Sequence, residues 1–135
     1  MARISEIRVA VPSFCCERED IVAEAKLWLS QTSKESALFE RFLGSSRIRR
    51  RHFVLPPAEI RALGGQAARC KIFAKEGTAL AAEAIGKVLA AAELTPRDID
   101  TLIFTSCTAP LIPSPDAYLV NVMEFSKHVR RLPIY

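Results

Sequence analysis

The sequence predicts a globular α/β fold, a mixed β-sheet with helices packed against it, and three observations support this. Half of the 135 residues are apolar, which is enough for a real core. A long alanine-rich segment has the apolar spacing of a helix. A short, almost continuously apolar segment follows it, typical of a strand buried on both faces. This order of helix and strand indicates a crossover unit.

The first elements are a strand and a helix. Apolar residues alternate along residues 7–11, which predicts a strand that Pro12 ends. Residues 17–31 then show helical spacing, with acidic residues in the first turn, where the helix dipole favours them. Trp28 falls on the apolar stripe of this helix, and we expect it in the core.

A second helix and an extended segment come next. Ser33 is a good N-cap for a helix that reaches Leu43, and Gly44 is a suitable left-handed stop. Residues 47–55 are expected to be extended, because the prolines at 56–57 disfavour helix before them.

The helical stripe of the alanine-rich segment predicts a helix over residues 72–92. Thr95, Pro96 and Asp98 then resemble a capping box that opens a single helical turn. The buried strand is predicted over residues 101–106.

The last elements are a further helix and strand. Ser114 and Pro115 can cap and begin a helix to Phe125, and residues 129–135 are again extended.

Composition excludes several classes of protein. The four cysteines lack metal-site spacing with the two histidines, so we expect free thiols and no metal. The charged N-terminus does not resemble a signal peptide, and no apolar run is long enough for a membrane span. These features predict a cytoplasmic protein with no membrane partner.

An arginine cluster at residues 47–51 accounts for much of the net charge of +4. Such a cluster is compatible with an anionic partner, but charge runs are more often solvated surface. Nucleic-acid binding is a weak alternative, because the cluster lacks interleaved aromatic residues and any known binding motif.

Three segments, taken together, resemble one enzyme family. They are residues 51–56 (RHFVLP), residues 94–100 (LTPRDID), and residues 105–108 (TSCT) with the downstream pairs PS at 113–114 and LVN at 119–121. Their order and spacing are similar to the N-terminal half of type III polyketide synthases, which have the thiolase-like fold, and most closely to microbial members such as phloroglucinol synthases. The resemblance covers nearly the whole chain.

The third segment discriminates within the thiolase-like enzymes. The middle segment is shared with the ketoacyl carrier-protein synthases that use CoA starters. Those synthases usually have an Arg-Thr-Gly pattern before the arginine-rich strand, whereas this chain has FLGSSRI at residues 42–48. The N-terminal half of such a synthase stays open as an alternative.

The resemblance implies an acyltransferase that joins an acyl-CoA starter to malonyl-CoA by Claisen condensation. The family's nucleophile is a cysteine, with a histidine and an asparagine as partners. That cysteine lies in a Gly-Cys step shortly after the position of Tyr135, and its partners lie further on, so the chain is expected to be truncated before the catalytic cysteine. We therefore assign no catalytic residue here and expect the chain alone to be inactive.

The resemblance also implies roles for four residues. Arg41 matches a residue that contacts the CoA phosphates, although Leu38 and Ser45 replace the neighbouring lysines of the family. Cys107 and Thr108 match residues that line the active-site cavity. Ile112 matches the position that reaches across the dimer interface into the partner's cavity.

The expected partners are acyl-CoA and malonyl-CoA in the complete enzyme, with either a homodimer or association with a C-terminal half. No cofactor, metal or nucleic acid is expected. A second hypothesis, from another class, is a catalytically inert dimerisation module, since the interface position Ile112 is present.

Overall fold

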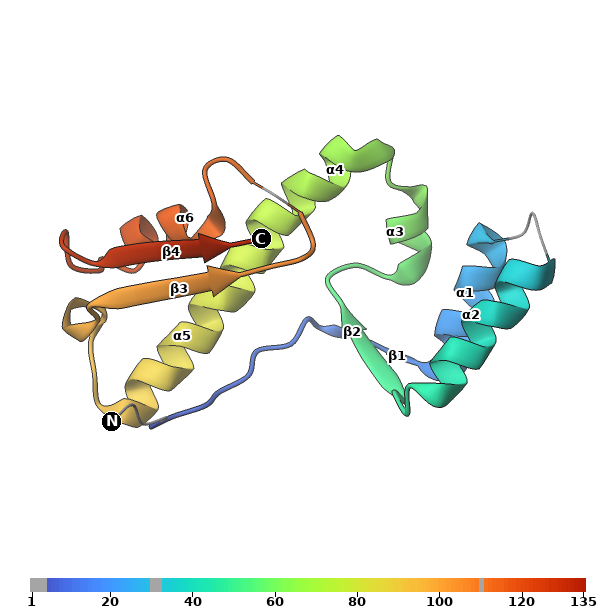
Figure 1. Ribbon diagram of the computed structural model, residues 1–135, viewed down its shortest axis with the longest axis horizontal. Helices are drawn as coiled ribbons and strands as arrows, with labels where there is room; N and C mark the ends of the chain where they lie inside the picture. The colour runs from blue at the N-terminus through green and yellow to red at the C-terminus, as the bar shows by residue number, and fades with distance from the viewer. Residues whose placement is uncertain (1–4, 30–32, 110) are drawn as a thin grey trace. The chain divides into compact units, whose positions relative to one another are not determined.

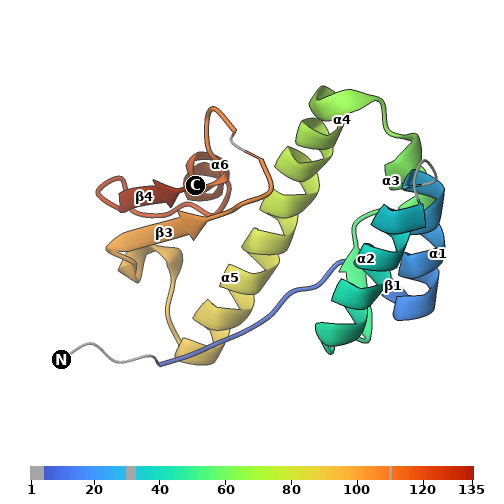
Figure 2. The same cartoon turned by 45° about the vertical axis from the view of Figure 1, so that its right-hand side comes forward.

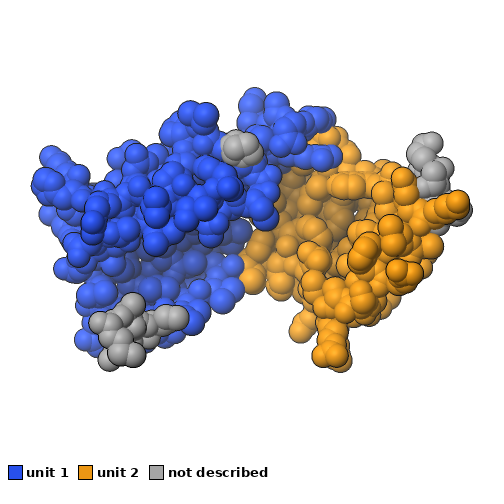
Figure 3. All heavy atoms as spheres, viewed as in Figure 1, with its two compact units in different colours: residues 1–10, 64–135 blue, residues 11–63 orange. Residues whose placement is uncertain are grey.

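The computed structural model describes residues 5–29, 33–109 and 111–135. The chain divides into two compact units (Figure 3). The larger unit comprises Met1–Ala10 and Gly64–Tyr135, and the smaller unit comprises Val11–Leu63. We describe each unit by itself.

The smaller unit is a two-stranded antiparallel ladder with three helices (Figure 1). Strand β1 (Phe14–Glu17) pairs with β2 (Arg50–Phe53), so that Phe14 lies opposite Phe53. Helix α1 (Arg18–Trp28) follows β1 directly and packs against α2 (Ser33–Ser45) and α3 (Pro57–Ala62).

The predicted first strand is displaced along the sequence. Residues 7–11 form no strand, and the strand lies at β1 instead. Ile7 and Val9 are each 70% exposed, and Lys87 Nζ donates a hydrogen bond to the Val9 carbonyl oxygen over 3.4 Å. Alternation of apolar residues makes a strand only where another strand offers a ladder of hydrogen bonds. Here β2 offers that ladder to residues 14–17.

Both predicted helices of the smaller unit exist. The first, expected over residues 17–31, is α1 (Arg18–Trp28), and residues 30 and 31 of that prediction lie outside the described residues. Helix α2 begins at Ser33 as expected but continues through Gly44 to Ser45, and Arg47, not the glycine, takes a left-handed conformation with φ of 56°. Trp28 is 49% exposed, so it is not a core residue in the described structure. Among the described residues of this unit, Leu43 is the buried apolar residue.

A long helical segment begins the larger unit. Helix α4 (Gly65–Ile72) passes through a π-helical turn, η1 (Phe73–Gly77), into α5 (Thr78–Ala92), so the helix starts earlier than the predicted residue 72. A Cβ atom at Gly77 would lie 3.0 Å from the Phe73 ring, which makes glycine suitable there. Glu93 ends α5 in a left-handed conformation.

The larger unit then forms the predicted crossover. Strands β3 (Thr101–Thr105) and β4 (Arg130–Ile134) are parallel, and α6 (Pro115–Val122) connects them (Figures 1 and 2). Helix α6 packs on α5, β3 and β4. The buried apolar residues of this unit come from α5, α6 and the segments that flank α6: Leu89, Ala109, Leu119 and Phe125.

Strand β3 is not buried on both faces, contrary to the sequence prediction. Leu102 and Phe104 are partly covered, whereas Ile103 is 61% exposed. Leu132, which lies beside Ile103 in the ladder, is 51% exposed. An apolar strand is buried on both faces only when a layer covers each face, and here α6 covers one.

An ion pair fixes α6 to β4. Asp116 is fully buried in the first turn of α6, and its Oδ2 accepts a hydrogen bond from Arg131 Nη1 over 3.2 Å. The Ser114 hydroxyl donates to the other carboxylate oxygen. The buried charge is thus compensated on both oxygens, as burial requires.

We predict that Asp116→Asn lowers the free energy of unfolding by about 1.5 to 3 kcal/mol, the range for a hydrogen bond to a charged group. Equilibrium denaturant unfolding measures this. The exposed pair of Lys87 and Glu83 is the control, and Glu83→Gln is expected to change stability by less than about 0.5 kcal/mol. Equal effects of the two substitutions would contradict the assigned role of Asp116.

The predicted capping box between Thr95 and Asp98 is present around the 3₁₀ turn η2 (Pro96–Asp98). The Asp98 carboxylate accepts hydrogen bonds from the Thr95 hydroxyl, over 2.6 Å, and from the Thr95 backbone N–H, over 2.8 Å. These bonds, the hydroxyl bond first, hold the pKa of Asp98 below its ordinary value.

We predict that Thr95→Val raises the pKa of Asp98 toward its ordinary value, which a carboxyl-detected NMR titration measures. Because the folded pKa is lowered, the stabilisation is complete above the ordinary pKa and is lost as the pH falls through the folded pKa. An unchanged Asp98 pKa in the variant would show that the Thr95 hydroxyl is not the main cause.

Candidate functional site

Two of the predicted site residues follow the carboxyl end of β3, beside the carboxyl end of β4. The ladder ends where the Ser106 N–H donates to the Ile134 carbonyl oxygen over 3.2 Å. Cys107 and Thr108 follow at once and are exposed, and the Thr108 N–H donates to the Ser106 hydroxyl over 3.1 Å. In parallel α/β sheets, ligands bind at this edge of the strands.

The third predicted site residue, Ile112, lies on the segment between β3 and α6. Ala109 is buried and anchors its start, while Ile112 is fully exposed and precedes Pro113 through a cis peptide bond. The Tyr135 hydroxyl donates to the Leu111 carbonyl oxygen over 3.4 Å. Asp116, held by Ser114 and Arg131, fixes the end of the segment. The structure therefore brings Cys107, Thr108 and Ile112 onto one connection at the carboxyl edge of the strands.

Arg41, the fourth predicted site residue, belongs to the smaller unit. It lies on α2, is exposed, and makes no hydrogen bond or ion pair with any described residue. Leu38, one turn earlier, is 48% exposed, and Phe42 is 64% exposed. An unpaired guanidinium can bind a phosphate group through charge-assisted hydrogen bonds, but Leu38 and Phe42 beside it add no positive charge.

Acidic side chains lie beside the arginine cluster in the folded structure. Arg18 Nε donates to the Ile48 carbonyl oxygen over 3.0 Å, and Arg50 lies 3.9 Å from Glu17. A polar hollow beside them is lined by Glu17, Arg18, Glu19 and Arg49. Because carboxylates share this surface with the arginines, it does not form a uniformly basic patch.

The cysteines do not form a reactive pair. All four are free thiols, as expected, and Cys107 is exposed. Partial burial, then the Asp20 carboxylate and the Cys15 thiol, raise the pKa of Cys16, which disfavours its thiolate. The described residues contain no cluster of potential metal ligands. None of their helices is both long and apolar enough to cross a bilayer.

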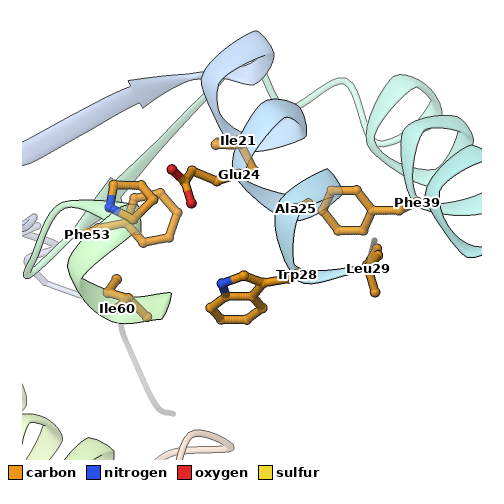
Figure 4. A pocket seen from close by; sticks show the side chains of 9 residues that line it. Ile21, Glu24, Ala25, Trp28, Leu29, Phe39, Phe53 and Ile60 are labelled. Atoms are coloured by element: carbon orange, nitrogen blue, oxygen red, sulfur yellow. The ribbon is translucent and has the colours of Figure 1, made fainter. Parts of the chain in front are cut away.

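An apolar pocket in the smaller unit was not expected from the sequence (Figure 4). Its volume is about 230 Å³, and α1, α2, β2 and α3 contribute to it. The lining residues are Ile21, Glu24, Ala25, Trp28, Leu29, Phe39, Phe53, Pro57 and Ile60. The helical stripe that placed Trp28 in the core was the available signal, but a stripe does not show whether the opposing side chains fill the space.

Comparison with known proteins identifies relatives of the chain, although no family model matches it. A 1,3,6,8-tetrahydroxynaphthalene synthase from Streptomyces peucetius subsp. caesius is 31% identical over 98% of this chain and 35% of its own length. The phloroglucinol synthase of Pseudomonas fluorescens is 31% identical over 73% of this chain and 28% of its own length.

A solved structure shows the same relationship. The crystal structure of the Streptomyces coelicolor tetrahydroxynaphthalene synthase, a bacterial type III polyketide synthase, has 30% identity and a TM-score of 0.82, over 94% of this chain and 36% of its own. The chain is homologous to the N-terminal part of type III polyketide synthases. It spans about a third of the length of these relatives.

The fold extends to more distant synthases. A polyketide synthase from the brown alga Ectocarpus siliculosus matches with a TM-score of 0.76 at 23% identity over 95% of this chain, which shows likeness of fold. The thiolase-like α/β fold and the resemblance inferred from residues 51–56, 94–100 and 105–108 are thus confirmed.

Proposed function

We propose that this chain supplies the N-terminal part of a type III polyketide synthase that condenses an acyl-CoA starter with malonyl-CoA. The observation that carries the proposal is the match to the Streptomyces coelicolor synthase, with 30% identity and a TM-score of 0.82 over 94% of the chain. In such a reaction a cysteine thiolate takes the acyl group, and decarboxylation of the malonyl group generates the carbon nucleophile that attacks it.

The connection between β3 and α6 is the proposed contribution to the reaction cavity. Because β4 runs parallel to β3, residues that follow Tyr135 in a longer synthase begin beside Cys107 and Thr108. The family resemblance puts the nucleophilic cysteine shortly after that point. Cys107 and Thr108 therefore serve as cavity wall, and the nucleophile with its histidine and asparagine comes from the remaining part.

Arg41 is the proposed contact for the CoA phosphates. Its exposed guanidinium has no partner among the described residues, so it can form charge-assisted hydrogen bonds to phosphate oxygens without breaking existing ones. Leu38 and Ser45, which take the place of the family's lysines, add no cation within one turn of Arg41.

A chimera tests the proposal. In it, this chain replaces the matching part of the Streptomyces coelicolor synthase, and incorporation of labelled malonyl-CoA into product is measured. We expect condensation by the chimera and none by the 135-residue chain alone. Arg41→Ala should raise KM for acyl-CoA about tenfold or more, with kcat nearly unchanged, because the phosphates lie far from the reacting thioester.

Lys34→Ala is the matched control, since Lys34 is an exposed cation two turns earlier on the same helix. It should leave KM within about twofold. An unchanged KM in the Arg41 variant would remove the CoA assignment. A chimera that folds but never condenses would favour an inert interaction module instead.

Ile112 is the proposed contact with a partner subunit, and the complete protein is proposed to be a cytoplasmic homodimer. Full exposure of the Ile112 side chain, with Ile103 and Leu132 exposed on the strands, supports an interface on the larger unit. Apolar surface of this kind drives association.

We predict that the chain self-associates and that Leu132→Lys weakens the association at least tenfold, as measured by light scattering over a concentration series. Val122→Lys is the control, because Val122 is 72% exposed on α6 and outside the strand ladder. A monomer that melts cooperatively at high concentration would contradict the prediction.

A further inference from the structure

We propose that the apolar pocket of the smaller unit binds a small, flat, neutral aromatic molecule that carries a hydroxyl group. The pocket is built from residues of the smaller unit alone, and none of the proposed cavity or CoA residues lines it. The inference therefore goes beyond the proposed condensing function and does not depend on it.

The lining selects the shape of the ligand. Three aromatic rings, those of Trp28, Phe39 and Phe53, border the same hollow, and aliphatic side chains such as Ile21 and Ile60 complete it (Figure 4). Aromatic side chains favour stacked or edge-to-face contact with another ring. No lining residue is buried, so each retains apolar surface that a ligand would remove from water.

The volume of the pocket limits the size of the ligand. About 230 Å³ is below the usual range for drug-sized ligands and suits one or two fused rings. A peptide segment or a long acyl chain would extend beyond the hollow, leaving apolar atoms in water.

The Glu24 carboxylate determines which polar group a ligand can carry. Its Oε2 accepts a hydrogen bond from Arg61 Nε over 3.0 Å, which fixes the carboxylate at the edge of the pocket. A carboxylate offers about four lone-pair sites, so Glu24 can accept a further hydrogen bond beside the one from Arg61. A ligand hydroxyl can donate to this carboxylate, whereas a ligand carboxylate would be repelled by it. Arg61 already balances the Glu24 charge, so a cation gains little.

The sole tryptophan of the chain makes the test direct, because Trp28 gives one indole N–H signal in a ¹H–¹⁵N spectrum. We expect 2-naphthol to shift this signal saturably in the full 135-residue chain. The analogue 2-methoxynaphthalene lacks the donor and should bind at least fivefold more weakly.

Variants locate the binding. Ala25→Leu fills the pocket and should weaken 2-naphthol binding at least tenfold, whereas Ala23→Leu, at an exposed position of the same helix outside the pocket, should not. Circular dichroism shows whether the Ala25→Leu variant folds. If it does not, Ile60→Phe, which fills the pocket from α3, replaces it as the test variant. The Glu24→Leu variant should bind the two naphthalenes equally.

Three results would overturn the proposal. One is the absence of a saturable shift, and another is equal binding by the filled variants and the Ala23 control. The third is a Trp28 signal that moves with protein concentration and no longer responds to 2-naphthol, which would assign the pocket to contact between copies. None of these readouts uses condensing activity, so failure here is distinguishable from failure of the proposed function.

Discussion

The buried ion pair between Asp116 and Arg131 is the constraint on which the larger unit depends. Removing a carboxylate from water is costly, and the cost is offset because Arg131 and Ser114 bond both its oxygens at the start of α6, where the helix dipole also favours negative charge. The pair joins α6 to β4 and thereby fixes the end of the connection that begins at Cys107. Together with the Ser106–Ile134 hydrogen bond and the buried Ala109, this pair positions the carboxyl edge of the strands and its candidate cavity residues.

The smaller unit is held together differently. It has one buried apolar residue, Leu43, among those described, and its remaining apolar side chains are only partly covered. Pairing of β1 with β2 and the contacts of α1 with α2 and α3 set its shape. A small unit of this kind cannot bury much of its surface, and the space that its side chains leave open is the pocket beside Trp28. Weak packing and a potential ligand site therefore have the same physical origin.

Local chemistry predicted most elements of the chain. The helical stripe of residues 72–92, the capping box at Thr95 and the Ser114–Pro115 helix start are each specified by neighbouring residues, and each is present. The errors concern partners that are distant in sequence. The strand expected at residues 7–11 lies at Phe14–Glu17, because only there does β2 supply a ladder. Ile103 is exposed because burial depends on a covering layer, which an apolar strand cannot specify.

The sequence by itself determined the fold class, the family resemblance and the residue types at Arg41, Cys107, Thr108 and Ile112, because motifs and periodicity are properties of consecutive residues. Only the tertiary structure showed that Cys107 and Thr108 lie beside the end of β4, since strand register is set by hydrogen bonds between segments distant in sequence. It alone revealed the pairing of Asp116 with Arg131 and the pocket at Trp28. Both arise where side chains of separate elements meet, and the distance between such side chains is a result of packing.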